Sequence, residues 1–501
     1  MFQKNSTRWK VYFTLVKDGH IPMKIKFDTS YTTLPNVFFK TVQPTPVKKP
    51  NLILWNEDLA KELGITELSD SEKAEVFSGN TIVLESSPIA QAYAGHQFGN
   101  FTMLGDGRAI LLGEVLSPKG ERMDVQLKGS GRTPFSRGGD GRATLSSMLR
   151  EYIISEAMYN LCIPTTRSLA VVETGDFVYR ETKQTGGVLT RIAKSHIRVG
   201  SFEYAYQYTT ENDLKAYNDY VIQRHYPECN TKENPILEFF NIVIRNQLDL
   251  VVNWLRVGFI HGVMNTDNMS ISGETIDYGP CAFMNAYSPK TVFSSIDSGG
   301  RYAFGNQPSI AHWNLACLAN SLLPLIDKDV NLAVEKVRQS LDGYSDLFTQ
   351  KYWDMMAKKI GFPVSGEEEI SLINELLEWM EKNKADYTNT FIELEKSENA
   401  NLGIYSDPFF IDWKLRVVQL RTKKGVSEKT FSSLMTENNP YVIPRNHKVE
   451  KALEHARSGN YSVLVELTDL LKNPYLRRKD LDTQTEIPLG GDLGYRTFCG
   501  T

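Results

Sequence analysis

The chain has 501 residues, of which 41% are apolar and 23% are charged, and its formal net charge is −4. That length predicts two or three lobes instead of one core. The chain has 56 basic and 60 acidic residues, so its net charge does not attract nucleic acid or an anionic membrane. Any site that binds an anion must therefore be a local cluster of basic residues. The five cysteines show no C-x-x-C spacing, which argues against a zinc site and indicates a reducing compartment.

The first 22 residues are basic and have no long apolar core, so we do not expect a secretory signal. They could be a weak organelle address, or could precede a true start at Met23. No apolar run reaches membrane-spanning length. We expect a cytoplasmic protein without membrane or nucleic-acid partners.

The first half of the chain carries the pattern of a nucleotide-binding lobe. A short helix is predicted near Asn56, within a region, residues 1–90, that we expect to extend the core. A glycine pair at Gly105 and Gly107 precedes a strand at 109–116, a Ser-Pro-Lys-Gly turn and a strand at 122–128. Polar and apolar residues alternate along the second strand, which ends in Lys128.

A loop of five glycines and three arginines, residues 129–143, follows the second strand. Glycine lets backbone N–H groups approach an anion and arginine binds phosphate oxygens, but a flexible exposed loop would look the same. A helix then begins at the predicted N-cap Thr144. Glu151 and Glu156 both lie on or near its apolar face, and periodicity does not choose between them as a partner for Lys128.

After residue 186 the pattern becomes helical, with long helices expected at 235–259 and 308–327. Between them, residues 269–271 and 275–277 flank Ser-Gly-Glu and predict a tight hairpin. This hairpin would place Asn268 beside Asp277. Amide and carboxylate oxygens of this kind suit Mg²⁺ bound together with phosphate.

The order of these parts resembles a protein kinase: glycine loop, strand lysine, helix glutamate, His-to-Asn loop and Asp-x-Gly. We therefore expect an α+β, two-lobed, kinase-like fold with an amino-terminal lobe at 91–185 and a helical lobe with a tail at 186–501. Val263 stands where the kinase aspartate would be. His261 is expected to brace the backbone, and Asp267 either caps the loop or replaces the missing carboxylate as proton acceptor.

Long stretches of the chain resemble the selenoprotein O family, among them YAGHQFGNFTMLGDGRA, DVQLKGSGRTPFSRGGDGRATLSSMLREY, HGVMNTDNMSISGETIDYGPCAF and the ending YRTFCGT. The resemblance runs from about Phe27 to Thr501. It implies a kinase-like protein adenylyltransferase that binds ATP in a flipped orientation. Such an enzyme transfers AMP to Ser, Thr or Tyr hydroxyls of proteins, with Mg²⁺ or Mn²⁺ as cofactor.

The resemblance also implies roles for individual residues. Asp267 would be the proton acceptor, and Asn268 and Asp277 would hold the metal. Nucleotide contacts are implied for Gly105, Gly107, Arg108, Lys128, Asp140, Gly141, Glu151, Arg191, Arg198 and Asp277. Cys281 and Cys499 could form a regulatory disulfide, or remain unlinked. A kinase that uses the γ-phosphate and a non-catalytic nucleotide-binding scaffold are the alternative functions.

Overall fold

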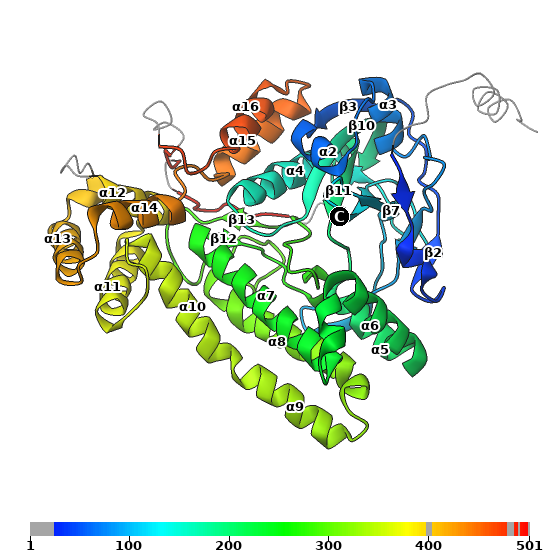
Figure 1. Ribbon diagram of the computed structural model, residues 1–501. Helices are drawn as coiled ribbons and strands as arrows, with labels where there is room; N and C mark the ends of the chain where they lie inside the picture. The colour runs from blue at the N-terminus through cyan, green and yellow to red at the C-terminus, as the bar shows by residue number, and fades with distance from the viewer. Residues whose placement is uncertain (1–24, 397–402, 478–484, 489–490, 499–501) are drawn as a thin grey trace, which may run out of the picture.

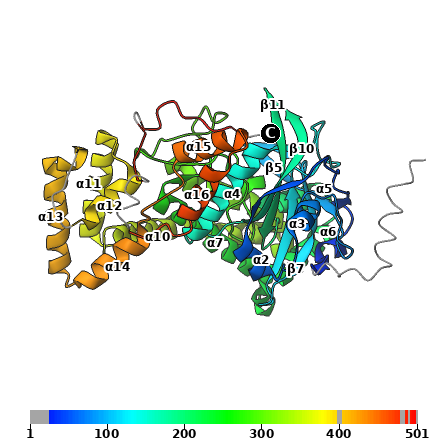
Figure 2. The same cartoon turned by 90° about the horizontal axis from the view of Figure 1, so that it is seen from above.

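The computed structural model describes residues 25–396, 403–477, 485–488 and 491–498. The expectations about residues 1–22 and about Cys499 lie outside these ranges. Within them the chain is a mixed α/β protein, with one large antiparallel sheet on one side and the helices α7 to α14 on the other (Figure 1). Helices α11 to α14 lie farthest from the sheet (Figure 2).

The main sheet has nine strands in the order β2-β4-β7-β8-β11-β10-β3, with β1 paired to β7 and β9 paired to β11. The predicted strands at 109–116 and 122–128 are confirmed as β7 and β8. The strands are β1 (Phe27–Asp28), β2 (Phe39–Thr41), β3 (Asn51–Trp55), β4 (Ile89–Gln91), β7 (Ala109–Leu116), β8 (Arg122–Lys128), β9 (Ala143–Thr144), β10 (Arg167–Tyr179) and β11 (Lys183–Ala193). Two short pairs lie outside it: β5 (Ala94–Gln97) with β6 (Asn100–Met103), and β12 (Phe259–Ile260) with β13 (Ala282–Phe283).

Both faces of the sheet are covered. Successive side chains of a strand point to opposite faces. Val171 and Leu189 therefore pack into the larger core, whereas their neighbours Val172 and Val188 pack into a smaller one. The smaller core is closed by α2 (Glu57–Leu63) and α3 (Asp70–Phe77), and the larger one by α4 (Leu145–Asn160).

Two predicted helix starts are confirmed by side-chain caps. The Asn56 side chain accepts a hydrogen bond from the Leu59 amide at the start of α2. The Thr144 side chain accepts one from the Ser147 amide at the start of α4. Such caps depend on a few adjacent residues, which is why local sequence predicts them.

The boundary expected at 185 falls inside strand β11, which continues to Ala193, and the next helix begins only at Val199. The helices are α5 (Val199–Tyr208), α6 (Glu211–His225), α7 (Pro235–Val257), α8 (Gln307–Ile326), α9 (Val330–Asp342), α10 (Tyr344–Lys359), α11 (Glu367–Asn383), α12 (Tyr387–Glu395), α13 (Pro408–Lys423), α14 (Glu428–Asn438), α15 (Asn446–Arg457) and α16 (Ser462–Leu470). The helices expected at 235–259 and 308–327 correspond to α7 and α8. The last two helices return to pack against α4 (Figures 1 and 2).

The hairpin predicted at 269–277 is wrong. Ser270 is bridged to Arg198, and Thr275 is bridged to Thr165, so the two arms pair with different segments and not with each other. The Val199 amide donates to the Met269 carbonyl at 2.9 Å, and the Thr275 amide donates to the Pro164 carbonyl at 2.9 Å. Local turn chemistry indicated a hairpin, but tertiary partners took the backbone groups that it would have used.

Contrary to the expectation that no apolar run reaches membrane-spanning length, one described segment, Phe304–Ile326, is long and apolar enough to cross a membrane by length and composition alone. Half of its most apolar window is buried inside the protein. Its helix α8 packs against α5, α7 and α9, as a core helix does.

Candidate active site

A pocket of about 480 Å³ lies between the loops of the sheet and the segment that follows α7. Its size is typical of a small-molecule site. Basic side chains outnumber acidic ones in its wall. Seven lining residues are basic, namely Arg108, Lys128, Arg137, Arg142, Arg180, Arg191 and Arg198, and four are acidic, namely Asp106, Asp140, Asp267 and Asp277.

Two glycine-rich loops form the outer wall of the pocket and hold each other in place. A Cβ at Gly105, where φ is +118°, would lie 2.4 Å from the Phe135 ring. Thr133 Oγ1 donates to the Asp106 carbonyl at 2.6 Å, and Ser136 Oγ donates to the Gly107 carbonyl at 2.5 Å. These contacts attach loop 129–143 to the glycine loop and make it part of the pocket wall, while Arg132, Arg137 and Asp140 are exposed.

Asp140 and Gly141 line the pocket, but the Asp140 carboxylate already has partners. Arg180 binds it at 2.9 and 3.0 Å, and the Arg142 amide donates to it at 2.9 Å. The hydrogen bond from Arg180 lowers the pKa of Asp140, so this side chain remains charged. A Cβ at Gly141 would lie 2.1 Å from the Gly131 carbonyl oxygen, so this position requires glycine.

Lys128 Nζ lies at the inner end of the pocket, between two carboxylates. It is 2.6 Å from Glu151 Oε2 and 2.8 Å from Asp277 Oδ1. The other helix glutamate, Glu156, binds Arg167 at 2.7 Å. Glu151, and not Glu156, is therefore the partner of Lys128, a question that helical periodicity left open.

Asp277 is held by three cations. Besides Lys128, Arg191 approaches Oδ1 at 2.6 Å and Arg198 approaches Oδ2 at 2.5 Å. These cations outweigh the effect of burial, which alone would raise the pKa of Asp277, and they hold that pKa well below its usual value. Its backbone has φ of +64°, an uncommon conformation for a residue other than glycine.

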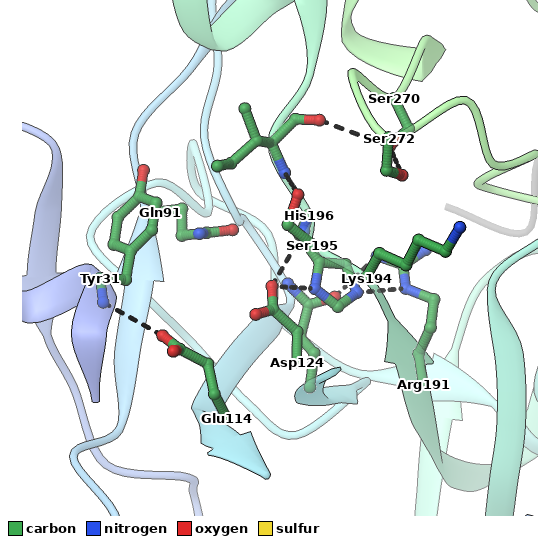
Figure 3. A network of polar contacts seen from close by, with 12 residues as sticks. Tyr31, Gln91, Glu114, Asp124, Arg191, Lys194, Ser195, His196, Ser270 and Ser272 are labelled. Carbon is green, nitrogen blue, oxygen red and sulfur yellow. Dashed lines mark hydrogen bonds and ion pairs between the residues drawn. The ribbon is translucent and has the colours of Figure 1, made fainter. Parts of the chain in front are cut away.

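A hydrogen-bonded chain behind the pocket fixes the orientation of Arg191 (Figure 3). Arg191 Nε donates to His196 Nε2 at 3.2 Å, and His196 Nδ1 lies 2.9 Å from Asp124 Oδ2. Arg191 Nη2 also donates to Gln126 Oε1 at 2.7 Å. Burial lowers the pKa of His196 to about 4, so the ring is neutral and can accept from the arginine. Neither His196 nor Asp124 is predicted as a site residue from the sequence, because the only signal for each is its position inside a motif rich in other charged residues.

Asp267 lies in a 3₁₀ turn, Thr266–Asn268, and is 8% exposed. Its Oδ1 makes no hydrogen bond to any described residue. A Cβ at Gly95 would lie 2.6 Å from that oxygen, so the strand β5 packs directly against it. Burial raises the pKa of Asp267 to about 6. Burial likewise raises the pKa of Asp106, in the glycine loop, to about 6.

Asn268 and Asp277 line the same pocket although no hairpin joins them. The Asn268 amide nitrogen donates to the Val263 carbonyl at 2.9 Å, which leaves its amide oxygen as an acceptor. His261 is buried, and its Nε2 lies 2.9 Å from the Ile276 carbonyl oxygen. These contacts agree with the expectation that His261 braces the backbone.

Cys281 is buried and free, and burial raises the pKa of its thiol to about 12. The structure records no disulfide among the residues it describes, and Cys499 is outside them. The tail does approach this region, because Thr497 Oγ1 donates to the Pro280 carbonyl at 2.6 Å.

Comparisons with known proteins identify the family of the chain. A family model described as protein adenylyltransferase SelO matches residues 22–472. A protein nucleotidyltransferase YdiU from Geobacillus kaustophilus is 51% identical over 479 residues, which cover 95% of this chain and 99% of that protein. The protein of the same name from Bacillus mycoides is 50% identical over 505 aligned residues, which cover 100% of each chain. These matches define an enzyme of the nucleotidyltransferase class. The chain belongs to the SelO family of protein adenylyltransferases.

Proposed function

We propose that this enzyme transfers AMP from ATP to Ser, Thr or Tyr hydroxyls of protein substrates, with the sheet and helical parts acting as the two lobes of a kinase-like fold. The observation that carries the proposal is the convergence of Lys128, Arg191 and Arg198 on the inner end of a pocket. A kinase aspartate is missing there and Val263 takes its place.

The three cations suit the phosphates of a flipped ATP. In AMP transfer the α-phosphorus is attacked and pyrophosphate leaves, so negative charge develops on the β- and γ-phosphates. Positive groups that are already fixed in a buried site stabilise such charge strongly. Gly105, Gly107, Arg108, Asp140 and Gly141 would form the outer part of this nucleotide site, and Glu151 would keep Lys128 in position.

The donor set fits a hard divalent cation. The Asn268 amide oxygen and the Asp277 carboxylate face one pocket, and both are oxygen ligands of the kind Mg²⁺ or Mn²⁺ takes together with phosphate. When bound, such an ion would neutralise phosphate charge.

Asp267 would accept the proton of the attacking hydroxyl. The hydroxyl oxygen forms a bond to the α-phosphorus, the bond from that phosphorus to the bridging oxygen breaks, and pyrophosphate carries away the electron pair. Asp267 lines the pocket, and burial raises its pKa to about 6, so its carboxylate is a suitable proton acceptor near neutral pH.

Intact mass spectrometry tests the proposal directly. The enzyme is incubated with Mg²⁺, a generic protein substrate and ATP labelled on the α- or the γ-phosphate. AMP transfer adds one AMP and the α-label to the substrate. Addition of one phosphate with the γ-label would mean kinase chemistry and would overturn the flipped orientation.

The pH dependence of the reaction should report on Asp267. A proton acceptor works only when deprotonated, so kcat should rise as pH increases through about 6, the pKa of the buried carboxyl. Asp267→Asn should lower kcat by about 100-fold or more and abolish this rise. Asp106→Asn is the matched control, since burial raises the pKa of Asp106 to a similar value, about 6. If the rise disappears in the Asp106 variant and persists in the Asp267 variant, the assignment is wrong.

His196 should act as a positioning residue for Arg191. His196→Ala removes an acceptor from a buried guanidinium, and we expect the KM for ATP to rise by about tenfold, since a hydrogen bond to a charged group contributes about 1.5 kcal/mol. His196→Gln should restore much of the affinity, because its amide can accept from Arg191 and donate to Asp124. A purely structural role would instead change thermal stability and leave KM as it is.

A further inference from the structure

A second cluster of ligand-type side chains lies outside the nucleotide pocket. It consists of His96 from β5, Glu203 from α5 and Cys317 from α8, whose ligand atoms all lie within 4.8 Å of one another. His96 Nδ1 is 2.5 Å from Glu203 Oε1. The three residues come from elements far apart in the sequence, so no short sequence motif predicts the cluster.

The cluster has an unused ligand atom. Glu203 is 4% exposed, and its Oε2 makes no hydrogen bond to any described residue. Leaving a carboxylate oxygen in this state costs free energy unless something binds it. Burial raises the pKa of Glu203 and raises that of Cys317 to about 12, so neither group is stable as an anion without a nearby positive charge.

Two aromatic rings lie beside His96, whose side chain is 27% exposed. The His96 ring lies 5.1 Å from the Phe101 ring and 5.2 Å from the Trp313 ring, measured between centroids. Apolar neighbours of this kind lower the local dielectric on that side and so strengthen the attraction between an ion and its ligands.

We propose that His96, Glu203 and Cys317 bind a zinc ion, separate from the Mg²⁺ or Mn²⁺ of the catalytic pocket. A thiolate, an imidazole and a carboxylate together suit Zn²⁺ and do not suit Mg²⁺. With bonds of about 2.0–2.3 Å, the ligands of tetrahedral zinc lie roughly 3.3–3.8 Å apart. Binding therefore needs the His96–Glu203 contact to open and the Cys317 sulfur to move slightly inward. The cysteine loses its proton to solvent, and water can take the fourth position.

Such an ion would anchor the β5–β6 hairpin to the helical part of the protein. The same hairpin forms part of the catalytic wall: Gly95 packs on Asp267, and Gln97 and Phe98 line the pocket. The His96 amide also donates to Thr266 Oγ1 at 2.7 Å, directly before Asp267. The zinc site would thus hold the wall of the catalytic pocket against the residue that accepts the proton.

Cobalt titration of the full-length, chelator-treated protein tests this inference. Co²⁺ replaces Zn²⁺ in such sites, and a cobalt–thiolate bond gives a near-ultraviolet absorption band that oxygen ligands such as Asn268 and Asp277 cannot produce. We expect one equivalent of Co²⁺ to generate the band and one equivalent of Zn²⁺ to remove it. Cys317→Ser should abolish the band, and Cys162→Ser, which changes an exposed free thiol, should retain it.

His96→Gln provides a second variant in case Cys317→Ser does not fold, and it should weaken Co²⁺ binding by at least tenfold. Circular dichroism of each variant establishes that it is folded. Absence of the band in the wild-type protein, or a band of full intensity in Cys317→Ser, would overturn the zinc site. Neither result would affect the proposed AMP transfer, which is measured by mass in the presence of Mg²⁺ alone.

Discussion

Asp277→Asn is expected to lower nucleotidyl transfer by at least about 100-fold, because the carboxylate is both a proposed metal ligand and the common partner of three cations. The variant should also be less stable without nucleotide. Arg191 and Arg198 side chains are 2% and 3% exposed, so removal of the negative charge leaves them close together in a buried site. Single-turnover AMP transfer and thermal unfolding measure the two effects.

A thermal-shift experiment with pyrophosphate distinguishes the loss of the shared partner of the three cations from a general destabilisation of the fold. In the absence of a divalent metal, pyrophosphate should raise the Tm of Asp277→Asn more than that of the wild type, because the carboxylate no longer competes with phosphate for the cations. Asp249→Asn, which removes an exposed ion pair with Lys351, serves as a control and should behave as the wild type does. Equal stabilisation of all three proteins by pyrophosphate would contradict the assignment of these cations to phosphate.

Glu151→Gln and Glu156→Gln should separate catalysis from stability on one helix. Both glutamates belong to α4 and each binds a largely buried cation, Lys128 at 2.6 Å and Arg167 at 2.7 Å. Breaking either pair should destabilise the fold, by as much as about 3–5 kcal/mol where the partner is left uncompensated. Only Glu151→Gln should lower kcat/KM for ATP, by about tenfold or more, because Lys128 then loses one of the two carboxylates that position it in the pocket.

Chemical denaturation and steady-state kinetics with ATP check this pair. Both variants should lose stability by similar amounts, so a loss of activity in Glu151→Gln alone cannot come from unfolding. A comparable loss of kcat/KM in Glu156→Gln would mean that the helix as a whole, and not the lysine pair, governs nucleotide binding.

The sequence by itself determined the elements that depend on near neighbours. Alternation of polar and apolar residues located β8 and its terminal Lys128, because side chains of a strand alternate between faces. Asn56 and Thr144 marked the starts of α2 and α4, because an N-cap uses amides only two or three residues away. The order of loop, lysine, helix and Asp-x-Gly, together with the family resemblance, named several residues that line the pocket, among them Lys128, Asn268 and Asp277, but not Asp106 or Arg180.

Only the tertiary structure decided which partners each polar group finds. Both Glu151 and Glu156 lie on α4, but in the folded protein Glu151 faces Lys128 and Glu156 faces Arg167. The hairpin predicted at 269–277 does not form, because Ser270 pairs with Arg198 and Thr275 pairs with Thr165. The same cause explains the sites the sequence did not reveal: His196 behind Arg191, and His96 beside Glu203 and Cys317, meet through packing of distant elements, which no local pattern records.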